Sequence, residues 1–217
     1  MLEQLLQLDD RILLAVNGLH SDYFDHFMWL VSDKWVWVPL YLALAYALWW
    51  RFGWRGLVAG LLAVGLTFAV TDHFSIQVFR PIFNRLRPTC SDNPISVYVH
   101  LVNGYTSGRC GFPSAHAANT VGLAVLMGAV FRRRLLSLFL TGWVMLVCYS
   151  RMYLGVHYLG DLLGGAVFGA AVAGLSFWFY HATLRLHPED NGRGRMDFLP
   201  AVMGLCIILS VAFASCF

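Results

Sequence analysis

Charged residues are scarce in this 217-residue chain, because Asp, Glu, Lys and Arg together make up only 12% of it. A soluble domain carries roughly twice that share to cover its surface, so the composition argues against a water-soluble protein. No stretch is rich in Lys or Arg, which argues against binding to nucleic acid. Residues 1–20 include Glu3, Asp9 and Asp10 and have no basic segment, which is not typical of a cleavable signal peptide. The sequence also has no internal repeat and no low-complexity segment.

Hydrophobic residues, in contrast, make up 59% of the chain, and the mean hydropathy is +0.63. They are concentrated in long blocks, such as Leu57–Val70 and Leu162–Tyr180, which short polar stretches separate. This pattern is typical of a membrane protein with several spanning helices. Because the length favours one domain, we predict a single all-α membrane domain over residues 1–217.

Six hydrophobic blocks approach the ~20 residues that a helix needs to cross a ~30 Å hydrocarbon layer. The predicted spans are Phe27–Trp50, Gly56–Phe79, Ser114–Phe131, Leu135–Tyr153, Leu159–Tyr180 and Phe198–Cys216. Residues 1–22 precede them and form an amphipathic pattern, with Leu5, Leu8 and Ile12 near one face of a helix and Asp10 and Arg11 near another. We expect this helix to lie in the membrane interface, and an ordinary helix packed on the bundle is the alternative.

The distribution of positive charge predicts the orientation of the chain. Eight cations lie in three short connections on one side of the predicted bundle: Arg51, Arg55, Arg132, Arg133, Arg134, Arg185, Arg193 and Arg195. The positive-inside rule places this side in the cytoplasm. In a bacterial cytoplasmic membrane, both termini and the long loop of residues 80–113 then face the periplasm or the cell exterior.

Two of the five cysteines, Cys90 and Cys110, lie outside the predicted spans, and both belong to the outward loop. An oxidising compartment would allow them to form a disulfide that closes this loop. Two free thiols are the alternative.

Three polar stretches are hard to explain by packing: Arg80–Pro88, Pro113–His116 and Ser150–Asp161. All three lie at the outward ends of predicted spans, so the topology brings them to one membrane face. Any one ionisable residue at such a position is more often structural, so the case for function depends on the conjunction of the three stretches.

The residue types in these stretches suit a phosphate. Arg80, Arg87 and Arg151 are permanent cations that repel one another unless an anion lies between them. Ser114 begins a predicted helix, where free N–H groups and the helix dipole also favour an anion. Each feature alone has a structural explanation, such as an arginine that anchors to lipid headgroups or a serine that caps a helix. The prediction of a phosphate site depends on their combination on one face.

The same stretches contain groups that transfer protons or attack phosphorus. His116 and His157 can act as acid, base or nucleophile near neutral pH. Asp161 lies four residues after His157, so on a helical turn it could accept the imidazole N–H and orient the ring.

Together these stretches resemble the motifs of the type 2 phosphatidic acid phosphatase superfamily. The family pattern is Lys, six residues and Arg-Pro; then Pro-Ser-Gly-His; then Ser-Arg, five residues, His, three residues and Asp. This chain has Arg80 and Arg87-Pro88, then Pro113-Ser114-Ala115-His116, then Ser150-Arg151, His157 and Asp161. The resemblance spans roughly Gly56 to Tyr180, and it departs from the pattern at Arg80, which replaces Lys, and at Ala115, which replaces Gly.

The resemblance implies roles for the matching residues. His157 would be the nucleophile that forms a phosphohistidine, Asp161 would orient it, and His116 would protonate the leaving oxygen. Four residues would hold the phosphoryl oxygens: Arg80, Arg87, Ser114 and Arg151. Family members of this kind use no metal, and we expect no metal or other cofactor here, because no cluster of outward carboxylates suggests a magnesium site.

Asp72 and His73 form an ionisable pair within the second predicted span, about two helical turns before Arg80. We expect them to support this active-site arginine, and hydrogen bonding between helices is the alternative. Four further loop residues are expected to shape access to the site or contact a headgroup: Asn84, Arg85, Tyr105 and Arg109.

The resemblance implies a phosphatase whose partners are the bilayer and a membrane lipid phosphate or diphosphate, with no obligate protein partner. By analogy within the family we expect an undecaprenyl diphosphate phosphatase. A lipid A phosphatase, a phosphatidylglycerophosphate phosphatase and a lipid-to-lipid phosphotransferase are alternatives. A non-enzymatic transporter or scaffold is more remote, since the spans lack the paired helix breaks of transporters. Gly164, Gly165 and Gly169 could serve internal packing or dimerisation, so the oligomeric state stays open.

Overall fold

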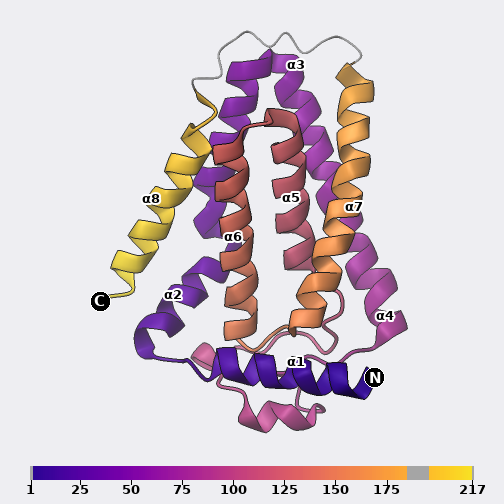
Figure 1. Ribbon diagram of the computed structural model, residues 1–217, viewed down its shortest axis with the longest axis vertical. Helices are drawn as coiled ribbons and strands as arrows, with labels where there is room; N and C mark the ends of the chain where they lie inside the picture. The colour runs from indigo at the N-terminus through magenta and orange to yellow at the C-terminus, as the bar shows by residue number, and fades with distance from the viewer. Residues whose placement is uncertain (1, 185–195, 217) are drawn as a thin grey trace.

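The computed structural model describes residues 2–184 and 196–216, and within these ranges its regular structure is helical apart from one isolated β-bridge. The helices are α1 (Leu2–Asn17), α2 (Asp22–Ser32), η1 (Lys34–Trp37), α3 (Val38–His73), η2 (Phe74–Phe79), α4 (Arg80–Phe83), η3 (Pro94–Tyr98), η4 (Val102–Gly104), α5 (Ala115–Phe131), α6 (Arg134–Tyr153), α7 (Leu159–Leu184) and α8 (Leu199–Ala214). The long helices run alongside one another, and α1 lies across one end of the bundle (Figure 1). The predicted all-α class is confirmed. Three cations of the predicted cytoplasmic loop, Arg185, Arg193 and Arg195, lie outside the described residues.

The first predicted span is wrong at its start, because the chain does not form one helix over residues 27–50. Helix α2 ends at Asp33, whose extended backbone (φ −78°, ψ 122°) interrupts the helical path. The Asp33 carboxylate accepts a hydrogen bond from the Trp35 N–H (3.0 Å) and so caps the short helix η1. Helix α3 then begins with Pro39 in its first turn, where a missing N–H is tolerated. The predicted span is therefore divided at the polar residues Asp33 and Lys34, where one helix ends and a capped short helix begins.

Helix α3 consists of two arms that fold back on one another at Gly53. This residue has φ +67° and ψ −168°, a backbone conformation that glycine adopts far more readily than other residues. The arms are in close contact, because a Cβ atom at Gly60 would lie 2.7 Å from Cδ1 of Leu48. The second arm continues through η2 and α4 and delivers Arg80 to the same end of the bundle as α1 (Figure 1).

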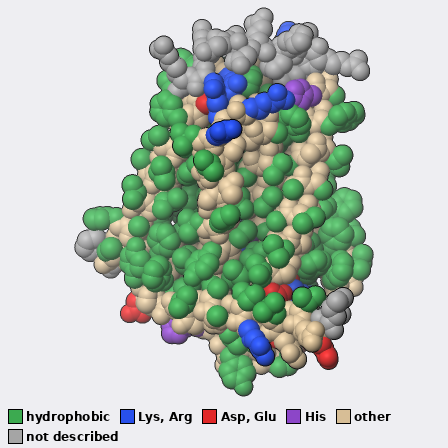
Figure 2. All heavy atoms as spheres, in the orientation of Figure 1, with side chains coloured by type: hydrophobic (Ala, Val, Ile, Leu, Met, Phe, Trp, Pro, Cys, Tyr) green, Lys and Arg blue, Asp and Glu red, His purple; other side chains and the backbone are tan. Residues whose placement is uncertain are grey.

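Three helical stretches are long and apolar enough to cross a membrane: Lys34–Phe83, which contains both arms of α3, Arg134–Tyr153 and Leu159–Ala182. Two shorter apolar helices, α5 and α8, lie beside them. Large apolar side chains are exposed on the flanks of the bundle, among them Leu138, Val167, Leu175, Trp178 and Leu209. Figure 2 shows hydrophobic side chains over the middle of one face, with charged side chains gathered toward its two ends. This surface is that of an integral membrane protein.

Helices α5 and α7 approach each other closely through glycines of α7. A Cβ atom at Gly165 would lie 2.3 Å from the carbonyl oxygen of Ser114, and one at Gly169 would lie 2.1 Å from that of Ala118. Gly164 likewise faces the ring of Phe112. These three glycines therefore serve packing within the chain, and the contact holds the first turn of α5 against the first turn of α7.

The end of the bundle opposite α1 is held together by a buried carboxylate. Oδ2 of Asp197 lies 2.8 Å from Nη1 of Arg51 and 2.8 Å from Nε of Arg133. Nη1 of Arg51 also donates to the carbonyl oxygen of Phe131 (2.8 Å). The cluster ties together the three connections that carry the predicted cytoplasmic cations.

Candidate active site

The long loop of residues 80–113 is closed at its base by a short antiparallel pairing. The N–H of Arg87 donates to the carbonyl oxygen of Arg109 (2.9 Å), and the N–H of Gly111 donates to that of Arg85 (2.9 Å). The isolated bridge between Leu86 and Cys110 lies between these bonds. The pairing places Arg87 and Gly111 beside the turn that joins α6 to α7.

Cys90 and Cys110 are free thiols, so the structure does not contain the predicted disulfide. The backbone pairing already closes the loop, and it sets Cys110 opposite Leu86 rather than opposite Cys90. Sγ of Cys110 contacts Oδ1 of Asn84 (3.2 Å), whereas the N–H of Cys90 turns back to the carbonyl oxygen of Arg87 (3.1 Å).

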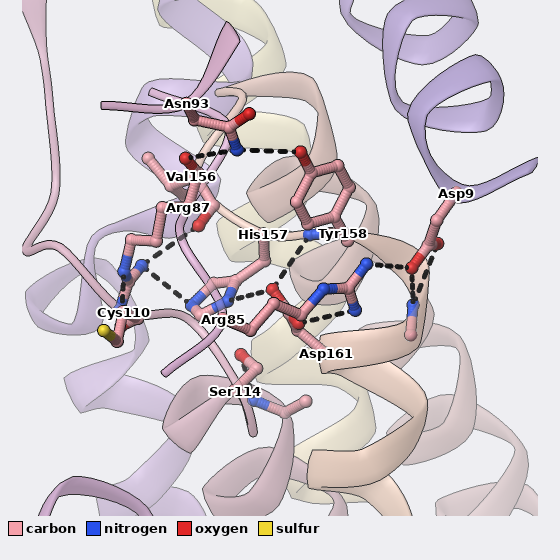
Figure 3. A network of polar contacts seen from close by, with 12 residues as sticks. Asp9, Arg85, Arg87, Asn93, Cys110, Ser114, Val156, His157, Tyr158 and Asp161 are labelled. Carbon is pink, nitrogen blue, oxygen red and sulfur yellow. Dashed lines mark hydrogen bonds and ion pairs between the residues drawn. The ribbon is translucent and has the colours of Figure 1, made fainter. Parts of the chain in front are cut away.

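His157 and Asp161 form the buried centre of the site (Figure 3). The imidazole is 1% exposed, and its Nδ1 lies 3.4 Å from Oδ2 of Asp161, which also accepts the N–H of Tyr158 (3.1 Å). On the other side of the ring, Nη1 of Arg87 lies 3.0 Å from Nε2. Arginine can only donate, so Nε2 is the acceptor and the ring proton is on Nδ1, facing the carboxylate. The contacts therefore select the tautomer in which Nε2 keeps its lone pair, as a nucleophile requires.

The protonation state of His157 can be tested directly. Burial, and next the positive charge of Arg87, lower the pKa of His157 well below its ordinary value of 6.5. We therefore expect the ring to remain neutral, with its proton on Nδ1, at about pH 5.5, where a free imidazole is mostly protonated. Nitrogen NMR of histidine-labelled protein checks this, with His157→Gln to assign the signal. An imidazolium signal from His157 at that pH would contradict the tautomer argument.

The three arginines of the motifs, Arg80, Arg87 and Arg151, lie near enough to His157 for their charges to lower its pKa. Burial, followed by repulsion from Arg80 and Arg151, lowers the pKa of Arg87 to about 10, so this guanidinium is still a cation at neutral pH. Within the described residues, the buried Nε–H groups of Arg80 and Arg151 have no hydrogen-bond partner. A bound phosphate would offset the repulsion and give these donors an acceptor.

Ser114 links the start of α5 to the centre of the site. It is fully buried, its Oγ accepts the N–H of Ala117 (3.4 Å), and its own N–H donates to the carbonyl oxygen of Asp161 (2.9 Å). His116 lies in the same first turn of α5 but is exposed and lines an open cavity. The two side chains thus differ in their exposure to solvent, because that of His157 is buried and that of His116 is exposed to the cavity.

Sequence reasoning missed Asp9 and gave Arg85 a different role from the one it has in the structure. Nη1 of Arg85 lies 3.0 Å from Oδ1 of Asp161, and its Nη2 lies 2.6 Å from Oδ2 of Asp9 (Figure 3). The guanidinium also lies over the ring of Tyr158, 4.4 Å from its centre. Asp9 further accepts the N–H of Gly160 (3.1 Å). Arg85, which the sequence linked only to substrate access, therefore joins helix α1 to the carboxylate that orients His157.

Helix α1 packs on the bundle with one face and exposes apolar residues on another. Its buried residues are Asp9, Leu13 and Asn17, spaced four apart, while Leu5 and Leu8 are exposed. Nδ2 of Asn17 donates to the carbonyl oxygen of Tyr153 (2.7 Å), which fixes the end of α1 on α6. The spacing of these three residues is the sequence signal that could have identified Asp9 as a buried carboxylate.

Replacing Asp9 with Asn should lower kcat by about 10-fold with little change in KM, because Arg85 loses the charge that holds it against Asp161. Steady-state phosphate release measures this. Asp92→Asn is the matched control. Asp92 lies in the loop of residues 80–113, which also contains Arg85, and it forms an exposed ion pair with Arg109 (3.3 Å). A merely structural role would lower the melting temperature and leave kcat at the control value.

The structure separates Asp72 from His73. Oδ1 of Asp72 accepts a hydrogen bond from Nδ2 of Asn119 on α5 (2.9 Å), and its charge also acts on Arg80. His73 is exposed and makes an edge contact with Phe74. Asp72 thus bonds between helices and faces an active-site arginine, whereas His73 is not brought to the site.

Comparisons with known proteins agree with this geometry. The sequence profile of the PAP2 superfamily matches residues 53–185. The chain is 40% identical over 196 residues to a lipid A 4'-phosphatase of Bacteroides thetaiotaomicron, covering 90% of this chain and 87% of the relative. It is 32% identical over 179 residues to a lipid A 4'-phosphatase of Porphyromonas gingivalis, covering 82% and 75%.

Among solved structures, the fold matches that of a transmembrane PAP2-type phosphatidylglycerolphosphate phosphatase from Bacillus subtilis. The TM-score is 0.61 with 20% sequence identity, over 85% of this chain and 90% of that one. The fold and the site thus define a membrane phosphatase that acts on lipid phosphates. The chain belongs to the PAP2 superfamily, as its three motifs predict.

Proposed function

We propose that this protein is a lipid A phosphatase that works through a phosphohistidine. The observation that supports the chemistry best is the position of His157, whose unprotonated Nε2 lies beside Arg87 while its Nδ1 faces Asp161. The choice of lipid is supported by the similarity to two lipid A 4'-phosphatases, which extends over most of the chain.

The reaction then proceeds in two steps at this site. In the first, Nε2 of His157 attacks phosphorus, the bond to the leaving oxygen breaks, and His116, which is protonated at this stage, donates its proton to that oxygen. Asp161 stabilises the positive charge that develops on the ring. In the second step, water attacks phosphorus while His116 accepts its proton, the bond from phosphorus to Nε2 of His157 breaks, and inorganic phosphate leaves. The arginines hold the phosphoryl oxygens throughout, so the charge of the transition state is stabilised by fixed donors.

The proposal includes a location and an orientation. Six apolar segments cross the membrane, namely the two arms of α3 and the helices α5, α6, α7 and α8. The end that carries Arg51, Arg133 and Asp197 faces the cytoplasm, in keeping with its short cationic connections. The site then faces outward from a bacterial cytoplasmic membrane, and α1 lies in the interface with Leu5 and Leu8 toward lipid.

Undecaprenyl diphosphate, the lipid expected first from the sequence, remains a prediction. The similarity to the two lipid A 4'-phosphatases favours the alternative, because it includes residues beyond the segment common to the superfamily. Residues outside that segment are where a family with one chemistry differs in substrate.

The function is tested by phosphate release from purified protein in detergent, in the presence of EDTA. The panel contains lipid A, undecaprenyl diphosphate, phosphatidylglycerophosphate and phosphatidic acid. We expect EDTA-resistant release with the highest kcat/KM on lipid A. A preference for another lipid would overturn the assignment of substrate, and loss of release with EDTA would overturn the metal-independent mechanism. If a phosphorylated acceptor lipid forms instead of free phosphate, the protein is a phosphotransferase.

A further inference from the structure

A cavity of about 460 Å³ opens beside the catalytic centre, between α2, η1 and the long loop. Its wall consists of Trp29, Ser32, Asp33, Lys34, Tyr105 and Leu154, together with His116 and Arg151 of the site. The cavity therefore adjoins the reacting groups, but most of its remaining wall comes from residues without a role in the chemistry described above.

The position of His116 decides what this cavity holds during the reaction. His116 is exposed and lines the cavity, whereas His157 is enclosed and is not part of the lining. An acid that protonates the leaving oxygen must lie within hydrogen-bonding distance of it. The group that leaves with that oxygen, which is the dephosphorylated headgroup, therefore occupies the cavity.

The lining of the cavity favours a sugar over an acyl chain. Trp29 and Tyr105 lie nearly perpendicular, with ring centres 5.2 Å apart, and offer aromatic surface to the C–H face of a ring. The exposed carboxylate of Asp33 can accept hydrogen bonds from hydroxyl groups. Lys34 beside it can donate to hydroxyl groups, whereas an acyl chain would bond to neither charged group.

The wall is held in place by contacts of its own. Arg151 donates hydrogen bonds to Oγ of Ser32 and to the hydroxyl of Tyr105, so one phosphate-binding arginine joins both sides of the cavity. The hydroxyl of Tyr153 donates to Oδ1 of Asp25 (2.6 Å), which fixes α2 on α6. The cavity is thus a built part of the site.

The α2 side of the wall lies outside the segment that the superfamily profile matches. Trp29, Ser32 and Asp33 all precede residue 53, where that match begins. This side can therefore differ among enzymes that share the same catalytic motifs.

We propose that this cavity binds the phosphorylated sugar of a glycolipid, with Trp29 and Asp33 as the residues that select it. The inference rests on the proposed function and adds the part of the site that recognises the headgroup. Substrate is then selected by α2 and by Asp33, which joins α2 to η1.

The test compares wild-type protein with Asp33→Asn and Trp29→Phe on lipid A and on phosphatidic acid, which has no sugar. Asn can still cap η1, and Phe keeps an aromatic ring, so both variants should fold. We expect the ratio of kcat/KM for lipid A to that for phosphatidic acid to fall about 10-fold for Asp33→Asn and about 3-fold for Trp29→Phe, through KM for lipid A. Trp35→Phe is the control, because Trp35 is 70% exposed and is not part of the lining. An unchanged ratio in both variants would overturn the proposal.

A soluble competitor separates this inference from the choice of lipid. Glucosamine 4-phosphate and glycerol 3-phosphate are compared as inhibitors of release from whichever lipid the protein prefers. Stronger inhibition by the sugar phosphate, weakened in Asp33→Asn, supports the sugar site even if lipid A is not the best substrate. Equal inhibition by both compounds overturns the sugar site even if lipid A is hydrolysed.

Discussion

Replacing His157 with Gln lowers kcat for phosphate release by at least about 10³-fold, because Gln has no nitrogen that can attack phosphorus. Gln is close to His in size and can still bond to Asp161, so the fold of the site should survive. Phosphate release under single-turnover conditions measures the effect. Circular dichroism and the melting temperature of the variant show whether the fold is retained.

His181→Gln is the control for this variant. His181 lies near the far end of α7 and packs against the ring of Phe177 (4.5 Å between centres), so its loss should leave activity at the wild-type level. If His157→Gln and His181→Gln are equally active, His157 is not the nucleophile and the proposed mechanism is wrong.

Replacing Gly111 with Ala should lower kcat by about 10²-fold, although Gly111 takes no part in the chemistry. A Cβ atom at this position would lie 2.8 Å from Oδ2 of Asp161, 3.1 Å from Cγ of Arg87 and 3.5 Å from Nδ1 of His157. The carboxylate or the loop must then move, and a displacement of this size is enough to disturb the alignment of a nucleophile. Steady-state kinetics on the preferred lipid provide the measurement.

Gly108→Ala is the matched control, since a Cβ atom at Gly108 would meet no atom within 4 Å in the same loop. The control should retain full activity and the same melting temperature. Equal activity of the two variants would show that the contact between the loop backbone and Asp161 does not hold the catalytic pair in place.

The residues of the three motifs could be predicted from the sequence because phosphate chemistry restricts which residue types can do the work. The topology prediction also succeeded in bringing these motifs to one end of the bundle, since each lies where an apolar block ends. His116, His157 and the three arginines accordingly gather around one centre.

The residues that position the catalytic side chains of the motifs could not be predicted from residue type alone. Asp9 is 152 positions from Asp161 in the chain, and their link through Arg85 depends on how α1 lies across the bundle. Gly111 is needed for the space that a side chain would fill, which is a property of the packed loop. Both depend on contacts that no local pattern specifies.

The prediction of helix boundaries was inaccurate for a different reason. Hydrophobicity shows a short polar break at Asp33 and Lys34, but it cannot show that Asp33 caps one helix and that Pro39 begins the next. The predicted disulfide was wrong in this structure because it was inferred from compartment and pairing, whereas the loop is closed by backbone hydrogen bonds next to Cys110.

Helix α1 connects an exposed apolar surface to the residues around His157. Its apolar residues Leu5 and Leu8 are exposed, while Asp9 on its buried face holds Arg85 beside Asp161. A shift of the helix would therefore change the environment of the residue that orients His157.

The most direct test of the central claim is to trap the phosphoenzyme. Wild-type protein is mixed with its preferred lipid, quenched in alkali within milliseconds, digested and examined by mass spectrometry. The account predicts a phosphoryl group on His157 that is stable to alkali, labile to acid and absent from the His157→Gln variant. A phosphoryl group on another residue, or rapid phosphate release with no phosphorylated enzyme at any time, would contradict it.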